Sequence, residues 1–191
     1  RIDSLLGYTY EQKEDYKQAI LAYRKAVALD KDNLDAVRGL AQNLLSDNQT
    51  EAALEQYKTI AAADPQDAQT LLHISEIYRR DGLFEKALDI LNKAQSIAQD
   101  SMEIEYSRAV IQEALGKYDE AARQVEALVT RTEKPNGVYT ASERNNRAIF
   151  LERLGTVYRD QNKTPMAVDT FRKMIALGDD SVARGYQQII D

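Results

Sequence analysis

Few side chains in this sequence belong to the types that form catalytic or metal-binding sites. Its 191 residues include one histidine, His73, and no cysteine. This count excludes any metal centre that needs two histidines or a thiolate, and any cysteine nucleophile. Carboxylates are plentiful, but most recur at helical spacing beside a lysine or arginine, as Asp169 does with Lys173. That pattern is typical of the solvated face of a helix.

The motifs that bind phosphate or activate a nucleophile are also missing. The sequence contains no glycine-rich phosphate loop, no His-Glu-x-x-His segment and no dinucleotide fingerprint. A lone histidine such as His73 is interpreted as a hydrogen-bonding residue of a binding surface rather than as a general base. We therefore predict a protein that is not an enzyme and that needs no metal and no cofactor.

Charge and hydropathy narrow the class of partner. The chain has 25 Lys and Arg against 31 Asp and Glu, a net charge of −6, and no basic stretch, which argues against nucleic acid. No apolar run approaches the ~20 residues of a membrane span. We expect a soluble segment, cytoplasmic or from a periplasmic or secreted protein, whose partner is another protein or a peptide.

The elements that position these side chains follow a 34-residue period. Spacings of three and four residues within each half of the period place the repeated positions on one helix face, so each unit is predicted to be two helices joined by a tight turn. An alanine column contains Ala19, Ala53, Ala87, Ala121 and, after an insertion of 12 residues, Ala167; a small-residue column contains Gly7, Ala41, Ser75, Ala109 and Gly155; and a column of large residues contains Tyr23, Tyr57, Leu91, Val125 and Phe171.

The predicted turn of each unit contains a residue that tolerates the left-handed backbone conformation. Gly82 and Gly116 share this column with Asn48 and Asn162. In the first 34-residue repeat this column contains Glu14, whose side chain makes that conformation cost roughly 1–2 kcal/mol. The first repeat is therefore predicted to be the least stable of the five.

These columns resemble the signature of the tetratricopeptide repeat family, in which Leu-Gly is followed by an aromatic residue, an alanine, a second aromatic residue and a proline. The resemblance covers nearly the whole chain as five repeats plus a final helix. It implies an all-α fold, a right-handed superhelical α-solenoid. The residues that match are Leu6-Gly7, Tyr10, Ala19 and Tyr23, then Leu154-Gly155, Tyr158, Ala167 and Phe171, with the proline present once as Pro65.

The resemblance also sets the expected domain organisation. Because the chain begins in what reads as the interior of a helix, we expect it to be a segment of a longer protein. We expect a single array over residues 1–191, with repeats at 1–33, 34–67, 68–101, 102–135 and 144–181, an insertion at about 132–143 and a terminal helix over 182–191.

The fourth repeat departs most from the pattern. Glu105, Arg108 and Gln112 occupy columns that are mostly apolar or aromatic in the other repeats. Two interpretations stay open. Either Arg108 pairs with a neighbouring acid inside an imperfect repeat, or the repeat acts as a flexible joint.

The resemblance further implies that the first helix of each repeat lines a concave groove that binds a protein or peptide segment. Tyrosine suits such a surface because its ring is rigid and apolar and its hydroxyl is polar. Three of the predicted groove residues also have a structural interpretation. Tyr106 matches a residue that is common in such repeats, and Tyr186 caps the end of the array. Arg79 lies at the end of a helix, where a cation interacts favourably with the helix dipole. The predicted groove residues are Tyr8, Arg38, Gln42, His73, Arg79, Tyr106, Arg153 and Tyr186.

The insertion offers a second candidate site. Residues 134–137, Lys-Pro-Asn-Gly, form a turn sequence, and residues 140–143, Thr-Ala-Ser-Glu, fit a capping box that starts a helix near Ala141. Val138 and Tyr139 lie between them and either pack on the array or contact a partner.

Two alternatives to groove binding follow. The chain is a regulatory or architectural arm of a larger enzyme or of a secretion or envelope assembly, which it contacts through its outer face or the insertion. Alternatively, it self-associates through the terminal helix.

Overall fold

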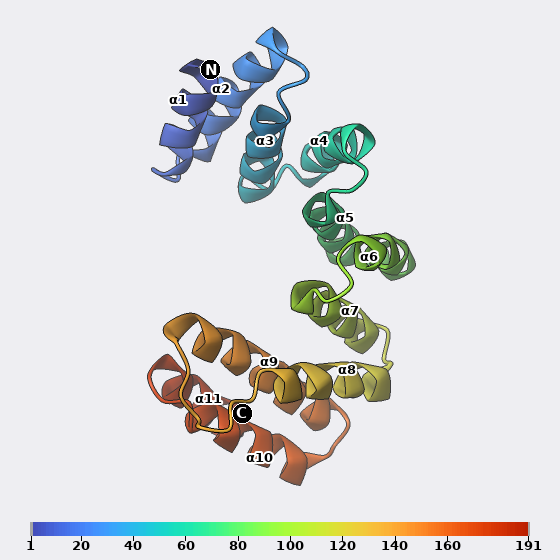
Figure 1. The fold of residues 1–191 in the computed structure, drawn as a ribbon, viewed down its shortest axis with the longest axis vertical. Helices are drawn as coiled ribbons and strands as arrows, with labels where there is room; N and C mark the ends of the chain where they lie inside the picture. The colour runs from blue at the N-terminus through green and yellow to red at the C-terminus, as the bar shows by residue number, and fades with distance from the viewer. Residues whose placement is uncertain (1, 191) are drawn as a thin grey trace. The chain divides into compact units, whose positions relative to one another are not determined.

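The computed structural model describes residues 2–190, and α-helices are the only regular secondary structure within that range (Figure 1). The predicted all-α helical-repeat fold is confirmed. None of the helices described there combines the length and the hydropathy of a membrane span. The eleven helices of residues 2–190 are α1 Ile2–Glu11, α2 Tyr16–Leu29, α3 Leu34–Ser46, α4 Thr50–Ala63, α5 Ala68–Arg80, α6 Phe84–Ile97, α7 Met102–Ala114, α8 Tyr118–Arg131, α9 Ala141–Asp160, α10 Thr164–Ile175 and α11 Asp180–Ile190.

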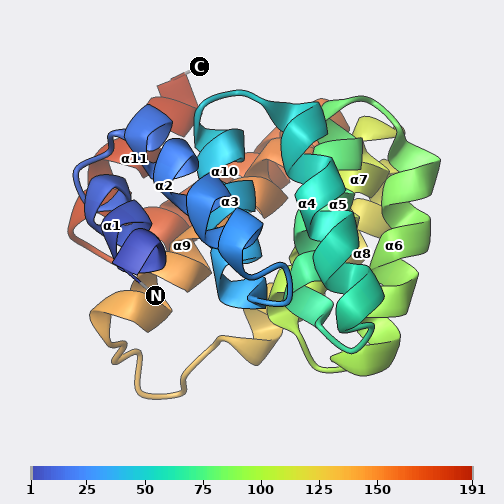
Figure 2. The ribbon, with the colours of Figure 1, turned by 90° about the horizontal axis from the view of Figure 1, so that it is seen from above.

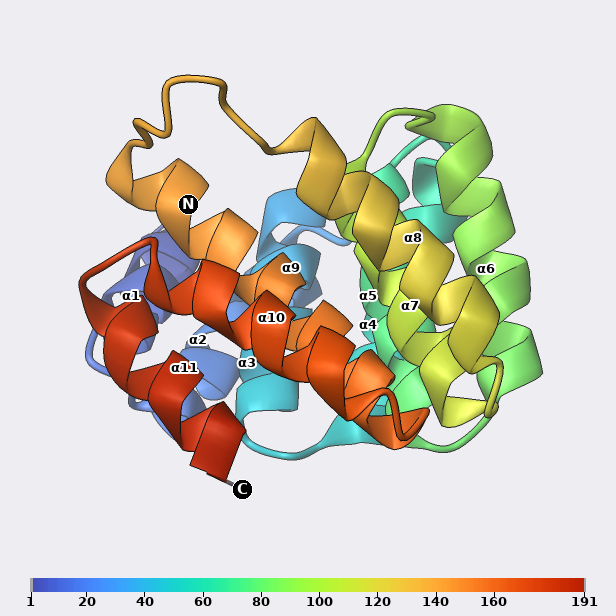
Figure 3. The same ribbon diagram turned by 90° about the horizontal axis from the view of Figure 1, so that it is seen from below.

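Contacts between helices divide the chain into two compact units, one that ends at Gln99 and one that begins at Asp100. In the first unit, α1 packs on α2 and α3, and each later helix up to α6 packs on the one before it (Figure 2). In the second unit, α7 packs on α8, α8 on α9 and α9 on α10, while α11 packs on both α9 and α10 (Figure 3).

The helix starts can be compared with the expected repeats. Helices α3, α5 and α7 begin at residues 34, 68 and 102, the first residues of three predicted repeats. The single array, the repeat bounds and the right-handed superhelix stay predictions. Arg1 and Asp191, which the predicted array includes, lie outside the described residues.

The turn inside each helix pair contains the left-handed residue that the sequence predicts. In each turn the N–H of the following residue donates to a carbonyl five residues earlier, as Leu83 does to Tyr78 over 2.8 Å. This bond satisfies a carbonyl that the ladder of the first helix leaves free. The left-handed residues are Glu14 (φ 57°), Asn48 (59°), Gly82 (73°), Gly116 (73°) and Asn162 (58°).

The core of each unit forms where small residues let an aromatic ring lie between two helix backbones. The alanines of the 34-residue column are at most 3% exposed. The ring of Tyr23 on α2 lies against Gly7 on α1 and Gly39 on α3. A Cβ atom at Gly7 would lie 2.9 Å from that ring, closer than carbon atoms pack. In the second unit, Phe171 on α10 lies in the same way against Gly155 on α9.

The two helices that flank α10 begin for local reasons. Helix α9 begins at Ala141, as predicted, because Thr140 and Glu143 form a capping box in which each side chain accepts the backbone N–H of the other. Helix α11 begins at Asp180, two residues before the predicted start. Gly178 and Asp179, both with positive φ, form the turn that ends α10, and their carbonyls accept the N–H groups of the first residues after Asp180.

The polar residues of the predicted fourth repeat lie in the second unit. Arg131, at the end of α8, donates to both carboxylate oxygens of Glu105 on α7, each over 2.7 Å. This ion pair ties the two helices together. Both interpretations of the repeat, an imperfect unit and a flexible joint, stay predictions.

Relief of the backbone strain at Glu14 should stabilise the first unit. We expect Glu14→Gly to raise the free energy of unfolding by about 1 kcal/mol, because glycine adopts positive φ without the steric cost that a Cβ atom imposes. Urea denaturation followed by circular dichroism measures the change. The neighbouring turn residue Lys13 lacks a positive φ. Lys13→Gly is therefore the matched control and should not stabilise; equal stabilisation by both variants would contradict the explanation.

Candidate functional site

Arg38, a predicted groove residue on α3, connects its helix to the start of α5. Its Nη1 donates to Asp67 Oδ2 over 2.8 Å and to Thr70 Oγ1 over 3.1 Å. Asp67 is the N-cap of α5 and also accepts the N–H of Thr70. Burial by itself raises the pKa of Asp67, but the hydrogen bonds from Thr70 and Arg38 outweigh it and place the pKa below its ordinary value. Arg38 is thus engaged within the first unit, with its side chain 32% exposed.

The predicted residues of α5 are also engaged in local contacts. The half-buried His73 ring stacks on Tyr57 of α4, with 4.9 Å between the ring centroids and 23° between the planes. Burial raises the pKa of Tyr57 to about 12. Arg79 forms a two-pronged ion pair with Glu76 one turn earlier, at 2.7 and 2.6 Å. The role of His73 as a hydrogen-bonding wall residue stays a prediction.

Tyr8 and Gln42 are the predicted groove residues of the first unit that lie most open to solvent. Tyr8 on α1 is 54% exposed. Gln42 on α3 is exposed beside a polar pocket of about 380 Å³, whose lining includes Glu11 and the buried Asn43. Asn43 Nδ2 donates to Glu11 Oε2 over 3.0 Å, which joins α3 to α1.

In the second unit the structure brings together two predicted groove residues from different helices. Arg153 on α9 lies with its guanidinium 5.8 Å from the ring centroid of Tyr106 on α7, and its Nε donates to the Tyr106 hydroxyl over 3.3 Å. The Tyr106 ring also lies 5.7 Å from that of Phe150, tilted by 43°. Arg153 Nη1 completes the cluster by an ion pair with Glu113 at 3.1 Å.

The charged members of this cluster are partly desolvated. Burial raises the pKa of Glu113, although the charge of Arg153 opposes that rise. Burial also lowers the pKa of Arg153, but the hydrogen bond and charge of Tyr106, together with Glu113, outweigh it and raise that pKa. The side chains of Arg153 and Glu113 are 30% and 13% exposed. Arg153 therefore retains an accessible edge while its orientation is fixed by two partners.

Tyr186 on α11 does not belong to this cluster. It is 56% exposed. Its helix is joined to α9 by other residues: Arg184 forms an ion pair with Glu152, and Gln188 donates to the same carboxylate. Self-association through this helix stays a prediction.

The two predicted insertion residues differ in their surroundings. The hydroxyl of Tyr139 accepts the N–H of Lys134 over 3.1 Å, and the guanidinium of Arg147 lies 5.6 Å from its ring centroid. Val138 is 67% exposed. Tyr139 thus packs on its own loop and on α9, whereas Val138 is exposed; a contact of either residue with a partner stays a prediction.

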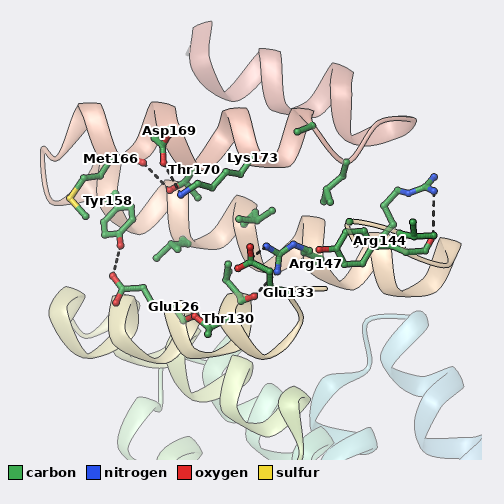
Figure 4. A pocket seen from close by; sticks show the side chains of 18 of the residues that line it. Glu126, Thr130, Glu133, Arg144, Arg147, Tyr158, Met166, Asp169, Thr170 and Lys173 are labelled. Atoms are coloured by element: carbon green, nitrogen blue, oxygen red, sulfur yellow. Dashed lines mark hydrogen bonds and ion pairs between the residues drawn. The ribbon is translucent and has the colours of Figure 1, made fainter. Parts of the chain in front are cut away.

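Both insertion residues line a cleft of about 940 Å³ in the second unit, which the sequence did not predict (Figure 4). The cleft lies between α8 and α10, and residues of α9 form its floor. In Figure 4, Arg144 lies toward the insertion, and Tyr158 and Met166 lie toward the other end. Its size is that of ordinary ligand pockets.

Arg147 is the functional candidate that sequence reasoning missed. This cleft residue is 6% exposed, and its Nη1 donates to the Val129 carbonyl over 2.5 Å and to Thr132 Oγ1 over 3.2 Å. A signal was present in the sequence: Arg147, Leu151 and Leu154 share one helix face, so a cation continues an apolar stripe. Among residues 2–190, histidine, aspartate and glutamate form no group of three that could hold a metal ion.

The comparisons with known proteins concern the repeats and the fold. Two sequence models described as tetratricopeptide repeat match residues 11–73 and 68–101. Anaphase-promoting complex subunit 3 of Schizosaccharomyces pombe is 23% identical over 168 residues, which cover 88% of this chain and 24% of that protein. The chain thus spans about a quarter of the length of this curated relative.

Solved structures share the arrangement of helices at low sequence identity. A thermophilic tetratricopeptide repeat protein of Thermus thermophilus superposes with a TM-score of 0.72 at 18% identity, covering 99% of this chain and 98% of that one. YrrB, described as a repeat protein with an unusual peptide-binding site, gives 0.65 at 16% identity over 96% and 90% of the two chains. At these identities the likeness concerns the fold.

The start of α9 gives a pH-dependent prediction. Hydrogen bonds from Lys134 and from the N–H of Thr140 lower the pKa of Glu143 from 4.5 to about 2. Because the folded-state pKa is depressed, this group stabilises the fold above pH ~4.5 and the contribution is lost as the pH falls toward ~2. We expect Lys134→Met to raise the pKa of Glu143, measured by NMR titration of its carboxyl carbon. Lys117→Met, which changes an exposed lysine before α8, should leave that titration unchanged.

Proposed function

We propose that this chain, which belongs to the tetratricopeptide repeat family, is a non-enzymatic interaction module that binds a segment of a partner protein. Within each unit taken by itself, the binding surface is the exposed faces of the first helices of the helix pairs, which include α3 and α5 in the first unit and α7 and α9 in the second. The names of one relative and one structural neighbour are consistent with this class of function: the relative is a subunit of a complex, and the neighbour is described as having a peptide-binding site.

The observation that supports this surface best is the Tyr106–Arg153 cluster. Tyrosine and arginine dominate the binding energy of protein interfaces because each combines a large contact area with polar groups. Here Phe150 and Glu113 hold the two side chains in place before a ligand arrives, so binding costs little side-chain entropy. The Tyr106 ring suits an apolar side chain of the ligand, and the exposed edge of Arg153 suits a carbonyl or carboxylate.

A second candidate function is supported by a different observation. The cleft of the second unit has exposed apolar side chains at two places, Val138 in the insertion and Met166 on α10, which are 67% and 46% exposed. In this role the chain is an architectural arm that contacts a larger assembly through the insertion.

Loss of the Tyr106 ring should weaken a ligand of the first-helix surface. For a peptide selected from a random display library on the whole chain, we expect Tyr106→Ala to raise the Kd at least about tenfold, because a half-buried aromatic contact is removed. Fluorescence anisotropy measures the Kd, and circular dichroism checks the helix content. Tyr106→Phe, which keeps the ring, should retain most of the affinity. Arg123→Ala, on the exposed face of α8, is the control, and unchanged affinity in Tyr106→Ala would reject this surface.

The insertion makes a separable prediction. If a partner uses the cleft, Val138→Asp should raise its Kd at least about tenfold, since a charge replaces an apolar contact that binding desolvates. Leu29→Asp, at an apolar position at the end of α2 that is 78% exposed, should have no effect. A ligand weakened by Tyr106→Ala and unaffected by Val138→Asp assigns binding to the first helices instead.

A further inference from the structure

We propose that the cleft between α8, α9 and α10 binds a partner segment through an acidic side chain of that segment, which pairs with Arg147. This inference lies outside the first-helix surface. It rests on the second candidate function and deepens it by naming the chemistry of the ligand.

The first step is the incomplete pairing of Arg147. Its side chain is 7% exposed, so its charge is largely removed from water. Nη1 is satisfied by a backbone carbonyl and a threonine hydroxyl, both neutral acceptors. Within the described residues, the only carboxylate paired with it is that of Glu133, 3.7 Å from Nη2, which is too long for a hydrogen bond. A buried guanidinium gains most from a carboxylate that accepts two short hydrogen bonds, and Arg147 lacks such a partner.

The second step concerns the other charges of the cleft, which are already paired with closer partners. Lys173 and Asp169 of α10 form an ion pair at 2.8 Å. Arg144 forms an ion pair with Asp179, and Glu126 accepts the hydroxyl of Tyr158.

Glu133 differs from these groups because its side chain is 65% exposed and its pairing distance is long. An incoming carboxylate can therefore displace Glu133 into water without breaking a short ion pair. Arg147 is the position in the cleft at which a ligand anion gains most.

The third step concerns what surrounds the pairing site. Lining residues continue on both sides of Arg147 along α9, with Arg144 toward the insertion and Tyr158 toward the other end (Figure 4). The acidic residue therefore lies within the bound segment and not at its C-terminus. The exposed Val138 and Met166 provide apolar contacts, so the ligand has apolar residues on each side of its acid.

The test uses the whole chain and five pools of ten-residue peptides with blocked ends. Each pool has a fixed residue at position five, namely Asp, Glu, Asn, Gln or Lys, and random residues elsewhere. Fluorescence anisotropy measures binding. We expect the Asp or Glu pool to bind at least about tenfold more tightly than its amide counterpart, because the pair with Arg147 requires a charge.

Two substitutions locate the site. Arg147→Met should abolish the preference for acid over amide, with folding checked by circular dichroism because Arg147 also bonds to the end of α8. Glu133→Gln removes the exposed competitor by changing only an exposed side chain, and should strengthen binding of the acidic pool severalfold. Glu120→Gln, which changes another exposed and loosely paired acid of the α8 region, is the matched control and should not.

Three results would overturn the inference. The first is equal binding of the acidic and amide pools. The second is a Glu133→Gln variant that binds the acidic pool no better than the Glu120→Gln control. The third is a preference for acid that is abolished by Tyr106→Ala and retained by Arg147→Met. The last result would leave the first-helix surface standing and remove only the cleft. A fourth result, preferential binding of peptides with a free C-terminus in a parallel set, would contradict the internal position of the acid.

Discussion

In both units, a glycine lies directly against an aromatic ring of a neighbouring helix, and the packing of the helices depends on this contact. Gly7 and Gly39 flank the ring of Tyr23, and Gly155 lies against Phe171. A methyl group at these positions would overlap the ring, so the helices would separate and the buried alanines beside them would lose their contacts. The same contact constrains the rotation of α1, α3 and α9 about their own axes. It thereby decides which side chains reach solvent, including those proposed to bind a partner.

Several arginines of this protein connect one helix to another. Arg38 links α3 to the cap of α5, Arg131 links α8 to α7, and Arg184 links α11 to α9. Each of these cations already has a carboxylate partner within hydrogen-bonding distance. Arg153 and Arg147 differ from these cations. One edge of the Arg153 guanidinium stays exposed while its partners fix its orientation. Arg147 is buried and, among residues 2–190, has no carboxylate within hydrogen-bonding distance. Binding capacity therefore depends on how completely each charge is satisfied rather than on how many charges there are.

Sequence reasoning predicted the local features of the insertion and missed its principal consequence. The capping box at Thr140 was readable because its two partners lie three residues apart. The exposure of Val138 and the packing of Tyr139 remained open alternatives, since either fits a short turn. Arg147 was not singled out because its burial requires Tyr139 to lie over it and α8 to supply a carbonyl acceptor. Neither condition is encoded within one helix.

The helices, their left-handed turns and the start of α9 were determined by the sequence alone, because each depends on residues within a few positions of one another. The tertiary structure decided which polar side chains form contacts between helices and which remain available to bind a partner. Arg153 meets Glu113 across 40 residues of chain, and the cleft is enclosed by α8 and α10, which α9 separates in sequence. Such contacts depend on the lateral packing of whole helices, and a periodic pattern along one helix contains no information about the side chains that a neighbouring helix places opposite it.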